Sequence, residues 1–239
     1  MAGKLEGKRV VLTGASRGIG YEIARRFLAE GAGLVICSRD PRRLERAAQE
    51  LRGVGPGIVL PVVCDLGRVG EEVGIVQAAE RAWGAIDILV NNAAVMLSSD
   101  DQLGLLGEPP GLLEDTLDIN LLAPMRLIRA AIALLEQSDD PRIINVSSGA
   151  GTLAAMRSSD LASYRLSKWA LNGLTLLLAE QLRGRVAVNA LDPGWVKTDM
   201  GGPNAPGSPA QSASGALALA TAPRKTTGEL WKDGLCISY

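Results

Sequence analysis

The stretch TGASRGIG, Thr13–Gly20, decides the fold and raises the first functional question. It follows a short apolar run, Val10–Leu12, and precedes apolar residues at helical spacing, so it joins a strand to a helix. Its glycines, Gly14, Gly18 and Gly20, favour a loop whose backbone N–H groups approach a pyrophosphate at a helix N-terminus. The same letters also satisfy G-x-S-x-G, the nucleophile elbow of serine hydrolases.

Composition decides between these two interpretations. The chain of 239 residues contains no histidine, which excludes a Ser-His-Asp triad and any histidine-based metal site. Three cysteines, Cys37, Cys64 and Cys236, lie far apart and are odd in number, so we expect buried reduced thiols and no metal. The glycine loop is therefore predicted to bind a dinucleotide.

Charge and hydropathy limit the partners. The net charge is −1, from 25 basic and 26 acidic residues spread along the chain, so neither nucleic acid nor a membrane surface is an expected partner. No apolar run approaches the roughly 20 residues of a membrane span, and the first residues lack a signal-peptide core. We expect a cytoplasmic protein that binds a small molecule.

Apolar runs alternate with helical patterns along the chain. The runs do not alternate with polar residues, as is typical of strands in a parallel sheet covered on both faces. We predict one α/β domain over residues 1–239, a doubly wound parallel sheet of Rossmann type with helices on both faces. The segment 199–215, rich in proline and glycine, is a candidate substrate lid within it. The expected strands are Val10–Leu12, Leu34–Cys37, Ile58–Val63, Ile86–Val90, Ile143–Val146 and Val186–Leu191, and the expected helices include 41–51, 70–83, 112–135 and 163–182.

The end of the second strand favours NADP(H) over NAD(H). Many NAD-binding folds place an acidic residue there to hold the ribose 2′-hydroxyl, whereas this strand ends in Ser38 and Arg39. Two guanidinium groups, Arg17 and Arg39, with a hydroxyl would hold a 2′-phosphate, which a carboxylate would repel. Asp40 is a competing contact for the ribose.

Proton chemistry is predicted from the pair Tyr164 and Lys168. Four residues apart, they share one face of the expected helix 163–182. An ammonium beside a phenol lowers the phenol pKa, which favours a general acid or base. The hydroxyls of Ser147 and Ser148 follow the fifth strand, where a doubly wound fold binds its ligand.

Taken together, the motifs resemble the short-chain dehydrogenase/reductase family over nearly the whole chain. The matching segments are TGASRGIG, Asp65-Leu66, Asn91-Asn92-Ala93-Ala94, Asn120, Ser148-Gly149-Ala150-Gly151, Tyr164–Lys168 and Pro193–Thr198. The resemblance implies that Tyr164 donates the proton, Lys168 lowers its pKa and binds the nicotinamide ribose, Ser148 holds the substrate oxygen and Asn120 anchors a water in a proton relay. It further implies a cofactor site, with Asp65 and Leu66 at the adenine, Asn92 and Ala93 near its ribose, and 193–198 at the carboxamide. The expected cofactor-binding residues are Gly14, Ser16, Arg17, Gly18, Ile19, Gly20, Ser38, Arg39, Asp65, Leu66, Asn92, Ala93, Tyr164, Lys168, Pro193, Gly194, Val196 and Thr198.

Within the family, the phrases TDMGGPNAP and TTGELWKDG resemble the NADPH-dependent carbonyl reductases, which implies reduction of a carbonyl to an alcohol. The expected pocket is apolar, with Leu153, Met156 and Trp195 in its wall. We expect two features to change the shape of the pocket entrance. These are an enlarged segment, 96–111, and a long connection between Ser148 and Tyr164. Ser147 competes with Ser148 for the serine role. A dinucleotide-binding sensor or scaffold without turnover is the alternative function.

The helices around 121–135 and 170–182 are apolar over more than one face. This pattern indicates burial against a second subunit as well as against the sheet. We expect a homodimer or homotetramer.

Overall fold

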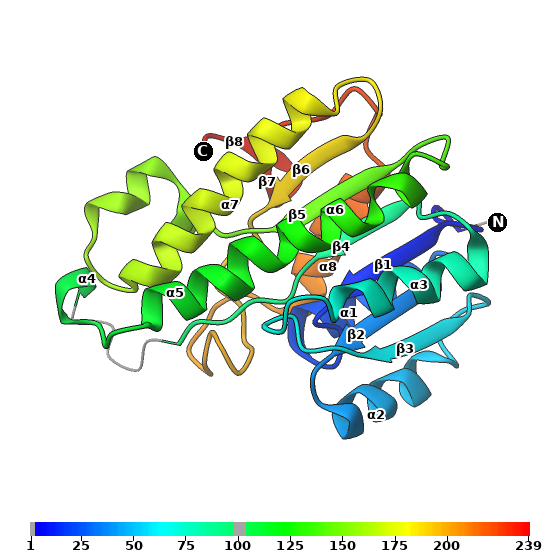
Figure 1. Ribbon diagram of the computed structural model, residues 1–239, viewed down its shortest axis with the longest axis horizontal. Coiled ribbons are helices and arrows are strands. Elements are labelled where there is room, and N and C mark those ends of the chain that lie inside the picture. The colour runs from blue at the N-terminus through cyan, green and yellow to red at the C-terminus, as the bar shows by residue number, and fades with distance from the viewer. Residues whose placement is uncertain (1–2, 98–103) are drawn as a thin grey trace.

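The computed structural model describes residues 3–97 and 104–239. A single sheet of eight strands has the order β3-β2-β1-β4-β5-β6-β7-β8 (Figure 1). Every neighbouring pair is parallel except β7 and β8, which form an antiparallel hairpin at one edge. The strands are β1 (Arg9–Thr13), β2 (Gly33–Ser38), β3 (Val59–Val63), β4 (Ile88–Asn91), β5 (Arg142–Val146), β6 (Ala187–Leu191), β7 (Leu230–Lys232) and β8 (Leu235–Ile237).

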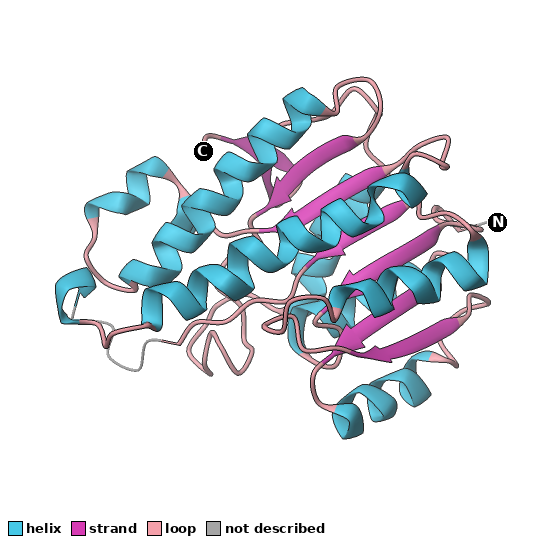
Figure 2. Ribbon diagram, in the orientation of Figure 1, coloured by secondary structure: helices cyan, strands magenta, loops and turns pink. Residues whose placement is uncertain are grey.

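Helices cover both faces of this sheet (Figure 2). Apolar residues of α3, α6 and α7 form one core with one face of the strands, and those of α1, α2 and α8 form a second core with the other face. The predicted doubly wound fold is confirmed. The helices are α1 (Gly18–Ala29), α2 (Pro41–Leu51), α3 (Glu72–Trp83), α4 (Gly104–Gly107), α5 (Leu112–Leu117), α6 (Ala123–Leu135), α7 (Ala162–Gln181) and α8 (Pro209–Ala220).

Burial on both faces explains the continuous apolar runs of the central strands. In β1, Val10 and Leu12 enter the core of α1 and α8, whereas Val11 enters the core of α3 and α6. All three side chains are fully buried. Strand β1 pairs with β2 on one side and β4 on the other, so the chain order reverses here. Ligands of doubly wound sheets bind at the carboxyl ends of the strands beside such a reversal.

Three short helical segments shape the carboxyl end of the sheet. A π-helical turn, η1 (Asp118–Leu122), joins α5 to α6, so the expected helix over 112–135 contains a wide turn. Two 3-10 segments, η2 (Gly149–Gly151) and η3 (Leu153–Arg157), fill the long connection between β5 and α7.

The expected lid over 199–215 is only partly irregular. Residues 209–215 belong to α8, which begins at a capping box in which Ser208 and Gln211 bond reciprocally. Because α8 packs against α1 in the core, only residues 199–208 remain as a loop that can cover a ligand.

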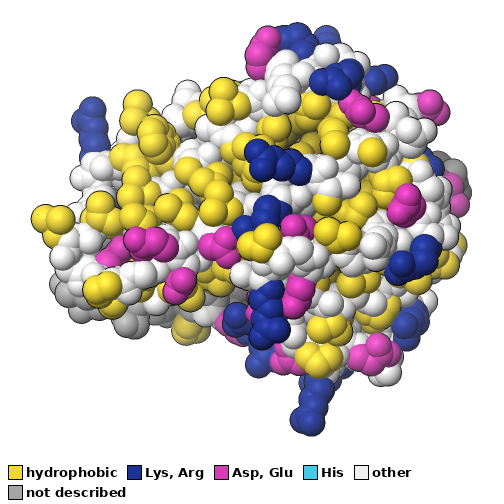
Figure 3. All heavy atoms as spheres, viewed as in Figure 1, with side chains coloured by type: hydrophobic (Ala, Val, Ile, Leu, Met, Phe, Trp, Pro, Cys, Tyr) yellow, Lys and Arg dark blue, Asp and Glu magenta, His cyan; other side chains and the backbone are white. Residues whose placement is uncertain are grey.

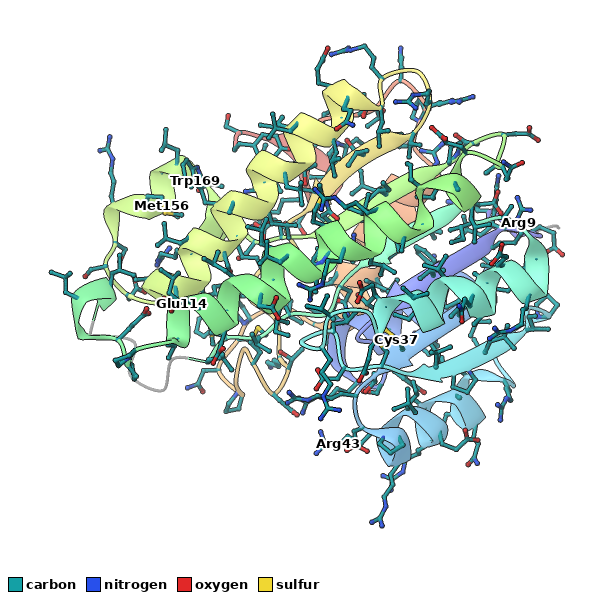
Figure 4. The ribbon with its side chains drawn as sticks, viewed as in Figure 1. Arg9, Cys37, Arg43, Glu114, Met156 and Trp169 are labelled. Carbon is teal, nitrogen blue, oxygen red and sulfur yellow. The ribbon has the colours of Figure 1, made fainter. Side chains whose placement is uncertain are left out.

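The expectation of three buried thiols is wrong for one of them. Cys37 and Cys64 are buried near the carboxyl ends of β2 and β3, and the neighbouring Cys64 thiol and burial raise the pKa of Cys37. Cys236 lies on the edge strand β8 and is exposed, because no further strand or helix covers that edge. Figure 4 shows Cys37 at the end of β2.

Candidate active site

The glycine loop joins β1 to α1 and needs glycine at two positions for close packing. A Cβ on Gly14, whose φ is +68°, would lie 2.9 Å from the Cα of Ala93. A Cβ on Gly20 would lie 2.3 Å from the carbonyl oxygen of Gly14. The loop therefore lies directly against the chain that follows β4, and a larger residue at either place would separate them.

Asn92 and Thr13 hold these two segments together. The Oγ1 of Thr13 accepts hydrogen bonds from the backbone N–H groups of Asn92 and Ala93, both at 3.0 Å. The Nδ2 of Asn92 donates to the carbonyl oxygens of Thr13 at 2.9 Å and Gly14 at 3.2 Å. The amide of Asn92 thus stabilises the loop itself.

The N-terminus of α1 lies at this loop. No side chain caps it, and Arg17 at the N-cap position has extended backbone. The first N–H groups of a helix have no intrahelical acceptor, and the helix dipole favours an anion beside them. The start of α1 is therefore chemically suited to a phosphate group.

A cavity of about 560 Å³ extends from the glycine loop to α7. Its volume is in the range of small-molecule and cofactor sites, about 300–1,000 Å³. The expected residues that line it are Gly14, Ser16, Arg17, Gly18, Ile19, Gly20, Ser38, Arg39, Asp65, Leu66, Asn92, Ala93, Tyr164, Lys168, Pro193 and Thr198. Four expected residues do not line it: Asn120, Ser148, Gly194 and Val196.

The sequence interpretation missed other residues in the cavity wall. Val95, Ile119, Lys197 and Met200 line it, each next to or within a recognised motif. Neither Leu153, Met156 nor Trp195 does. Trp195 is 59% exposed, and its Nε1 donates to the carbonyl oxygen of Gly201 at 2.7 Å, which turns the ring toward the loop 199–208.

The end of β2 carries the groups expected to distinguish the two dinucleotides. The Oγ atoms of Ser16 and Ser38 are 3.0 Å apart, and Arg39 is exposed beside them. Asp40 caps α2, since its carboxylate accepts from the backbone N–H groups of Arg42 and Arg43 at 2.9 and 3.1 Å. These hydrogen bonds lower the pKa of Asp40. The carboxylate of Asp40 is therefore already bonded to the start of α2, and a ribose would have to compete with these hydrogen bonds.

Arg17 is engaged with another residue. Its guanidinium forms an ion pair with Asp199 at the start of the loop 199–208. Both side chains are more than half exposed, and such surface pairs contribute little free energy. The pair connects the loop to the start of α1 through a contact that an anion can displace.

Tyr164 and Lys168 lie one turn apart on α7, as predicted, but their pKa values differ from the expectation. Burial raises the pKa of Tyr164 to about 12, a hydrogen bond with Ser148 opposes this rise, and the charge of Asp192 adds to it. Burial lowers the pKa of Lys168 to about 8. The Nζ of Lys168 lies 5.7 Å from the centre of the tyrosine ring and donates to the carbonyl oxygen of Val146 at 2.9 Å. The expected lowering of the phenol pKa by lysine is absent because burial dominates.

The two serines after β5 have different surroundings. Ser147 is buried, and its Oγ donates to the Oδ1 of Asn172 at 2.6 Å. Ser148 is partly exposed, and its hydroxyl is near enough to the phenol of Tyr164 to lower the phenol pKa. Of the two, Ser147 lines the cavity, whereas Ser148 is the hydroxyl that influences the tyrosine.

The side chain of Asn120 is occupied by structural hydrogen bonds. Its amide exchanges two hydrogen bonds of 2.8 Å with the backbone of Val95, and its Nδ2 also donates to the Oγ of Ser167 at 3.0 Å. Asn120 thus ties the segment after β4 to α7. It lies in the π-helical turn η1, where backbone geometry departs from that of an α-helix, as is frequent at functional sites.

The remaining expected residues have mainly backbone roles. Asp65 accepts from the N–H of Gly67 at 3.1 Å, and the carbonyl oxygen of Leu66 accepts from Arg126 at 2.7 Å, so the turn after β3 is fixed. Val196 is buried and pairs with Gly207 across the loop 199–208. The N–H of Gly194 donates to Asp192 at 3.0 Å.

Part of the enlarged segment 96–111, residues 98–103, lies outside the described residues. The part that follows supplies Glu108, whose carboxylate accepts from the backbone N–H of Ser163 at 3.1 Å and from its hydroxyl. Ser163 is in the first turn of α7, one residue before Tyr164. The segment therefore holds the start of the helix that carries the tyrosine.

The described residues contain neither a cluster of metal ligands nor a membrane-spanning helix. No cluster of three or more histidine, cysteine or acidic side chains there is arranged to hold a metal ion. Within residues 3–97 and 104–239, no helix combines the length and apolar character needed to cross a membrane.

Comparison with known sequences identifies relatives over most of the chain. The family model described as short chain dehydrogenase matches residues 8–208. Tropinone reductase-like 3 of Erythroxylum coca is 33% identical over 82% of this chain and 72% of its own length. Human dehydrogenase/reductase SDR family member 4 is 35% identical over 81% and 68%, and Escherichia coli oxidoreductase UcpA is 34% identical over 83% and 73%.

Solved structures resemble this fold closely. A putative short chain dehydrogenase from Pseudomonas syringae has a TM-score of 0.87 at 26% identity, with 96% of each chain covered. A short chain dehydrogenase from Burkholderia cenocepacia, solved in complex with NADP, has a TM-score of 0.84 at 26% identity over 95% of this chain and 96% of its own. A metagenomic short-chain oxidoreductase, also in complex with NADP, has a TM-score of 0.79 at 32% identity over 94% and 95%.

Proposed function

The chain belongs to the short chain dehydrogenase family, and on that premise we propose that it is an NADP(H)-dependent oxidoreductase that reduces a small carbonyl compound to an alcohol. The observation that carries this proposal is the place of Tyr164 and the buried Lys168, one helical turn apart on α7, in the wall of a cavity sized for a dinucleotide.

Tyr164 is the proposed proton donor. With its pKa at about 12, its phenol keeps the proton at neutral pH and has it available for an oxygen that becomes basic during reduction. The Ser148 hydroxyl, which lowers the phenol pKa, is the group proposed to hold the substrate oxygen beside it. Lys168, whose Nζ lies 5.7 Å from the centre of the ring, is the group proposed to bind the nicotinamide ribose beside the phenol.

The cavity fits the expected cofactor. The uncapped start of α1 supports a pyrophosphate site. We assign Ser16, Gly18 and Ile19 to the phosphates, Asp65 and Leu66 to the adenine, and Asn92 and Ala93 to its ribose. Lys168, Pro193 and Thr198 are assigned to the nicotinamide end. Bound NADPH supplies the hydride.

NADP(H) is favoured over NAD(H) by the charges at the end of β2. Arg39 forms no ion pair with any residue that the structure describes, and its guanidinium is free for a 2′-phosphate. Arg17 reaches the same phosphate by exchanging Asp199 for it. Asp40 is engaged as the cap of α2, so it does not repel the phosphate as an unpaired carboxylate at the ribose would. Two solved relatives contain NADP.

Asn120, Gly194 and Val196 receive revised roles. The amide of Asn120 is occupied, so its backbone in the π-helical turn is the group that would anchor a water. Val196 and Gly194 act by shaping the loop beside Pro193 and Thr198. The loop 199–208, tied to Arg17 through Asp199, is the proposed cover of the site.

An oligomer is proposed from the exposed apolar surface of α7. Trp169, Leu176 and Leu177 on this helix are 49%, 43% and 72% exposed. Figure 3 shows hydrophobic side chains gathered on the face that α6 and α7 form. Burying such side chains against a second copy is favourable, so we propose a homodimer or homotetramer. Gel filtration of the wild type and of Leu177→Lys tests this proposal, because the charge would release monomers.

NADPH absorbance followed with ketones, aldehydes, diketones and quinones tests the function. We expect consumption with at least one carbonyl class and slower consumption with NADH. A preference for NADH would contradict the roles of Arg17 and Arg39. Cofactor binding without turnover of any carbonyl would contradict the reductase and favour a dinucleotide sensor.

A further inference from the structure

The helix that carries Tyr164 begins without a cap from its own N-cap residue. Leu161, which precedes α7, has no polar side-chain atom to accept a hydrogen bond, and no cap bond is formed there. The first N–H groups of a helix have no intrahelical acceptor, so they need a partner from elsewhere. The backbone of Leu161 also has a φ of +52°, in the left-handed region that residues other than glycine seldom adopt. Contacts from outside the helix must therefore hold this conformation.

Glu108 provides the missing cap from a distant segment. It lies directly after α4 and 55 residues before Ser163 in the chain. Its Oε1 accepts from the backbone N–H of Ser163 at 3.1 Å, and its Oε2 accepts from the Ser163 hydroxyl. A carboxylate is well suited to this place, because the helix dipole is positive at the N-terminus. Ser163 is 1% exposed, so water has little access to replace the carboxylate.

Two further contacts fix the chain that enters α7. The guanidinium of Arg165 donates to the carbonyl oxygen of Asp160 and to its carboxylate, both at 2.7 Å. A Cβ on Gly104 would lie 3.6 Å from the Cβ of Ser159, so α4 lies against the same stretch of chain (Figure 1). The start of α7 is thus held between Glu108 and Arg165.

Tyr164 follows Ser163 directly and lines the cavity, whereas Glu108 does not line it. We propose that Glu108 is a positioning residue that acts through Ser163 on Tyr164, and that it holds the first turn of α7 where the phenol meets the substrate oxygen. This inference rests on the proposed function. A misplacement of about 1 Å can slow a reaction about 10²-fold, so a cap next to the proton donor affects turnover.

Lys168 makes the expected effect specific to the phenol. It lies a full turn further along α7, and its Nζ donates to the carbonyl oxygen of Val146 at 2.9 Å. Loss of the cap frees the first turn only, since fraying is confined to the end of a helix. The proposed cofactor contact of Lys168 should therefore survive without the cap, while proton donation by Tyr164 is impaired.

Steady-state kinetics of the full-length protein, with a carbonyl that the wild type reduces, test the proposal. Glu108→Ala removes both hydrogen bonds, so kcat should fall about 10-fold while KM for NADPH stays unchanged. Glu108→Gln keeps an oxygen that accepts from the N–H of Ser163 and has an amide that can donate to its hydroxyl, so kcat should return close to the wild-type value. Glu114→Ala is the matched control, because Glu114 is exposed on α5 (Figure 4), and its kinetics should be those of the wild type.

Three results would overturn the proposal. One is a kcat for Glu108→Ala equal to that of Glu114→Ala. Another is a loss of kcat accompanied by an equally large rise in KM for NADPH, which would mean that the whole site is disturbed. The third is a loss of kcat no larger than the unfolded fraction that thermal melting shows at the assay temperature, which would give Glu108 a role in stability alone.

A double-mutant cycle with Ser163→Ala checks that the effect passes through this residue. Ser163→Ala removes the hydroxyl and keeps the backbone N–H, so its loss of kcat should be smaller, about 3-fold. The double variant should be no slower than Glu108→Ala alone, because both changes remove the same contact. Losses that multiply would show two independent effects and would contradict the proposal.

A further measurement does not need turnover. Exchange of the Ser163 backbone amide with deuterium, followed by NMR, should be faster in Glu108→Ala than in the wild type and in Glu114→Ala. Equal rates in the three proteins would overturn the proposal. A wild type that reduces no carbonyl, together with faster exchange in Glu108→Ala, would contradict the proposed function and leave the contact of Glu108 with the start of α7 supported.

Discussion

Buried ionisable groups are stabilised in their charged form at one end of the sheet and in their neutral form at the other. Arg9 lies at the amino end of β1 (Figure 4). It donates three hydrogen bonds of 2.7–2.9 Å to Asp87, and Ser138 donates a further one. Burial alone would raise the pKa of Asp87, but these hydrogen bonds outweigh it and the pKa is lowered. At the carboxyl end, burial raises the pKa of Tyr164 and lowers that of Lys168.

The difference shows which end is built for stability and which for chemistry. A carboxylate with four donors is stabilised in its charged form and has no reason to exchange protons. A phenol and an ammonium that burial forces toward their neutral forms cost stability, and perturbed groups of this kind gather at functional sites. Substitutions at the two ends should therefore differ in sign.

The largest effect on stability is expected for Asp87→Asn. It leaves Arg9 without its anion, and breaking a largely buried pair costs about 3 kcal/mol of unfolding free energy. Because the folded-state pKa of Asp87 is depressed, the contribution is complete above the unfolded-state value of about 3.9 and is lost as pH falls through the folded pKa. Urea unfolding measures it. An equal cost at pH 7 and in strong acid would contradict this account.

Ser148→Ala separates the roles of the two neighbouring serines after β5. Loss of a hydroxyl that holds the reacting oxygen should lower kcat about 10²-fold, with little change in stability. Ser147→Ala, the control, loses a buried hydrogen bond to Asn172 and should cost about 1–2 kcal/mol of stability with a smaller effect on kcat. If the kinetic losses are reversed, Ser147 holds the substrate oxygen.

Lys168→Met should stabilise the fold, in contrast to Asp87→Asn. With its pKa at about 8 when folded and about 10.4 when unfolded, the lysine penalises folding fully below pH 8 and no longer above pH 10.4. The Val146 carbonyl loses its donor, so the net gain at pH 7 is about 1–2 kcal/mol. Thermal melting across pH tests it. A gain that does not shrink between pH 8 and 10 would contradict the assigned pKa.

The smallest effect is expected at the surface of the cofactor site. Arg39→Ala removes a contact to the 2′-phosphate and should raise KM for NADPH about 5–10-fold, with KM for NADH unchanged. Arg43→Ala is the matched control, because Arg43 is exposed on α2 and pairs with Asp40. Equal effects of both variants would point to general electrostatic attraction instead.

The sequence predicted the six strands β1 to β6, the doubly wound fold and the glycine loop that lines the cavity because these depend on local patterns. Continuous apolar runs mark strands buried on both faces, and glycines mark the loop. The hairpin of β7 and β8 was missed, since each strand has only three residues. The first part of α8, residues 209–215, was assigned to a lid, although Ser208 and Gln211 carried a capping-box signal.

Other features depend on contacts between distant segments and could not be predicted from local patterns. The occupied amide of Asn120, the cap that Asp40 provides and the ion pair of Asp192 with Lys232 all require the folded arrangement. The pKa of Tyr164 depends on burial, which outweighs the neighbouring lysine that the motif emphasises.

The most direct test of the central claim is NADPH consumption by Tyr164→Phe with the best carbonyl substrate, alongside NADPH binding and thermal melting. We predict that kcat falls about 10²–10⁴-fold, while cofactor affinity and melting temperature stay close to those of the wild type. Retention of wild-type turnover by the phenylalanine variant would contradict the assignment of Tyr164 as the proton donor.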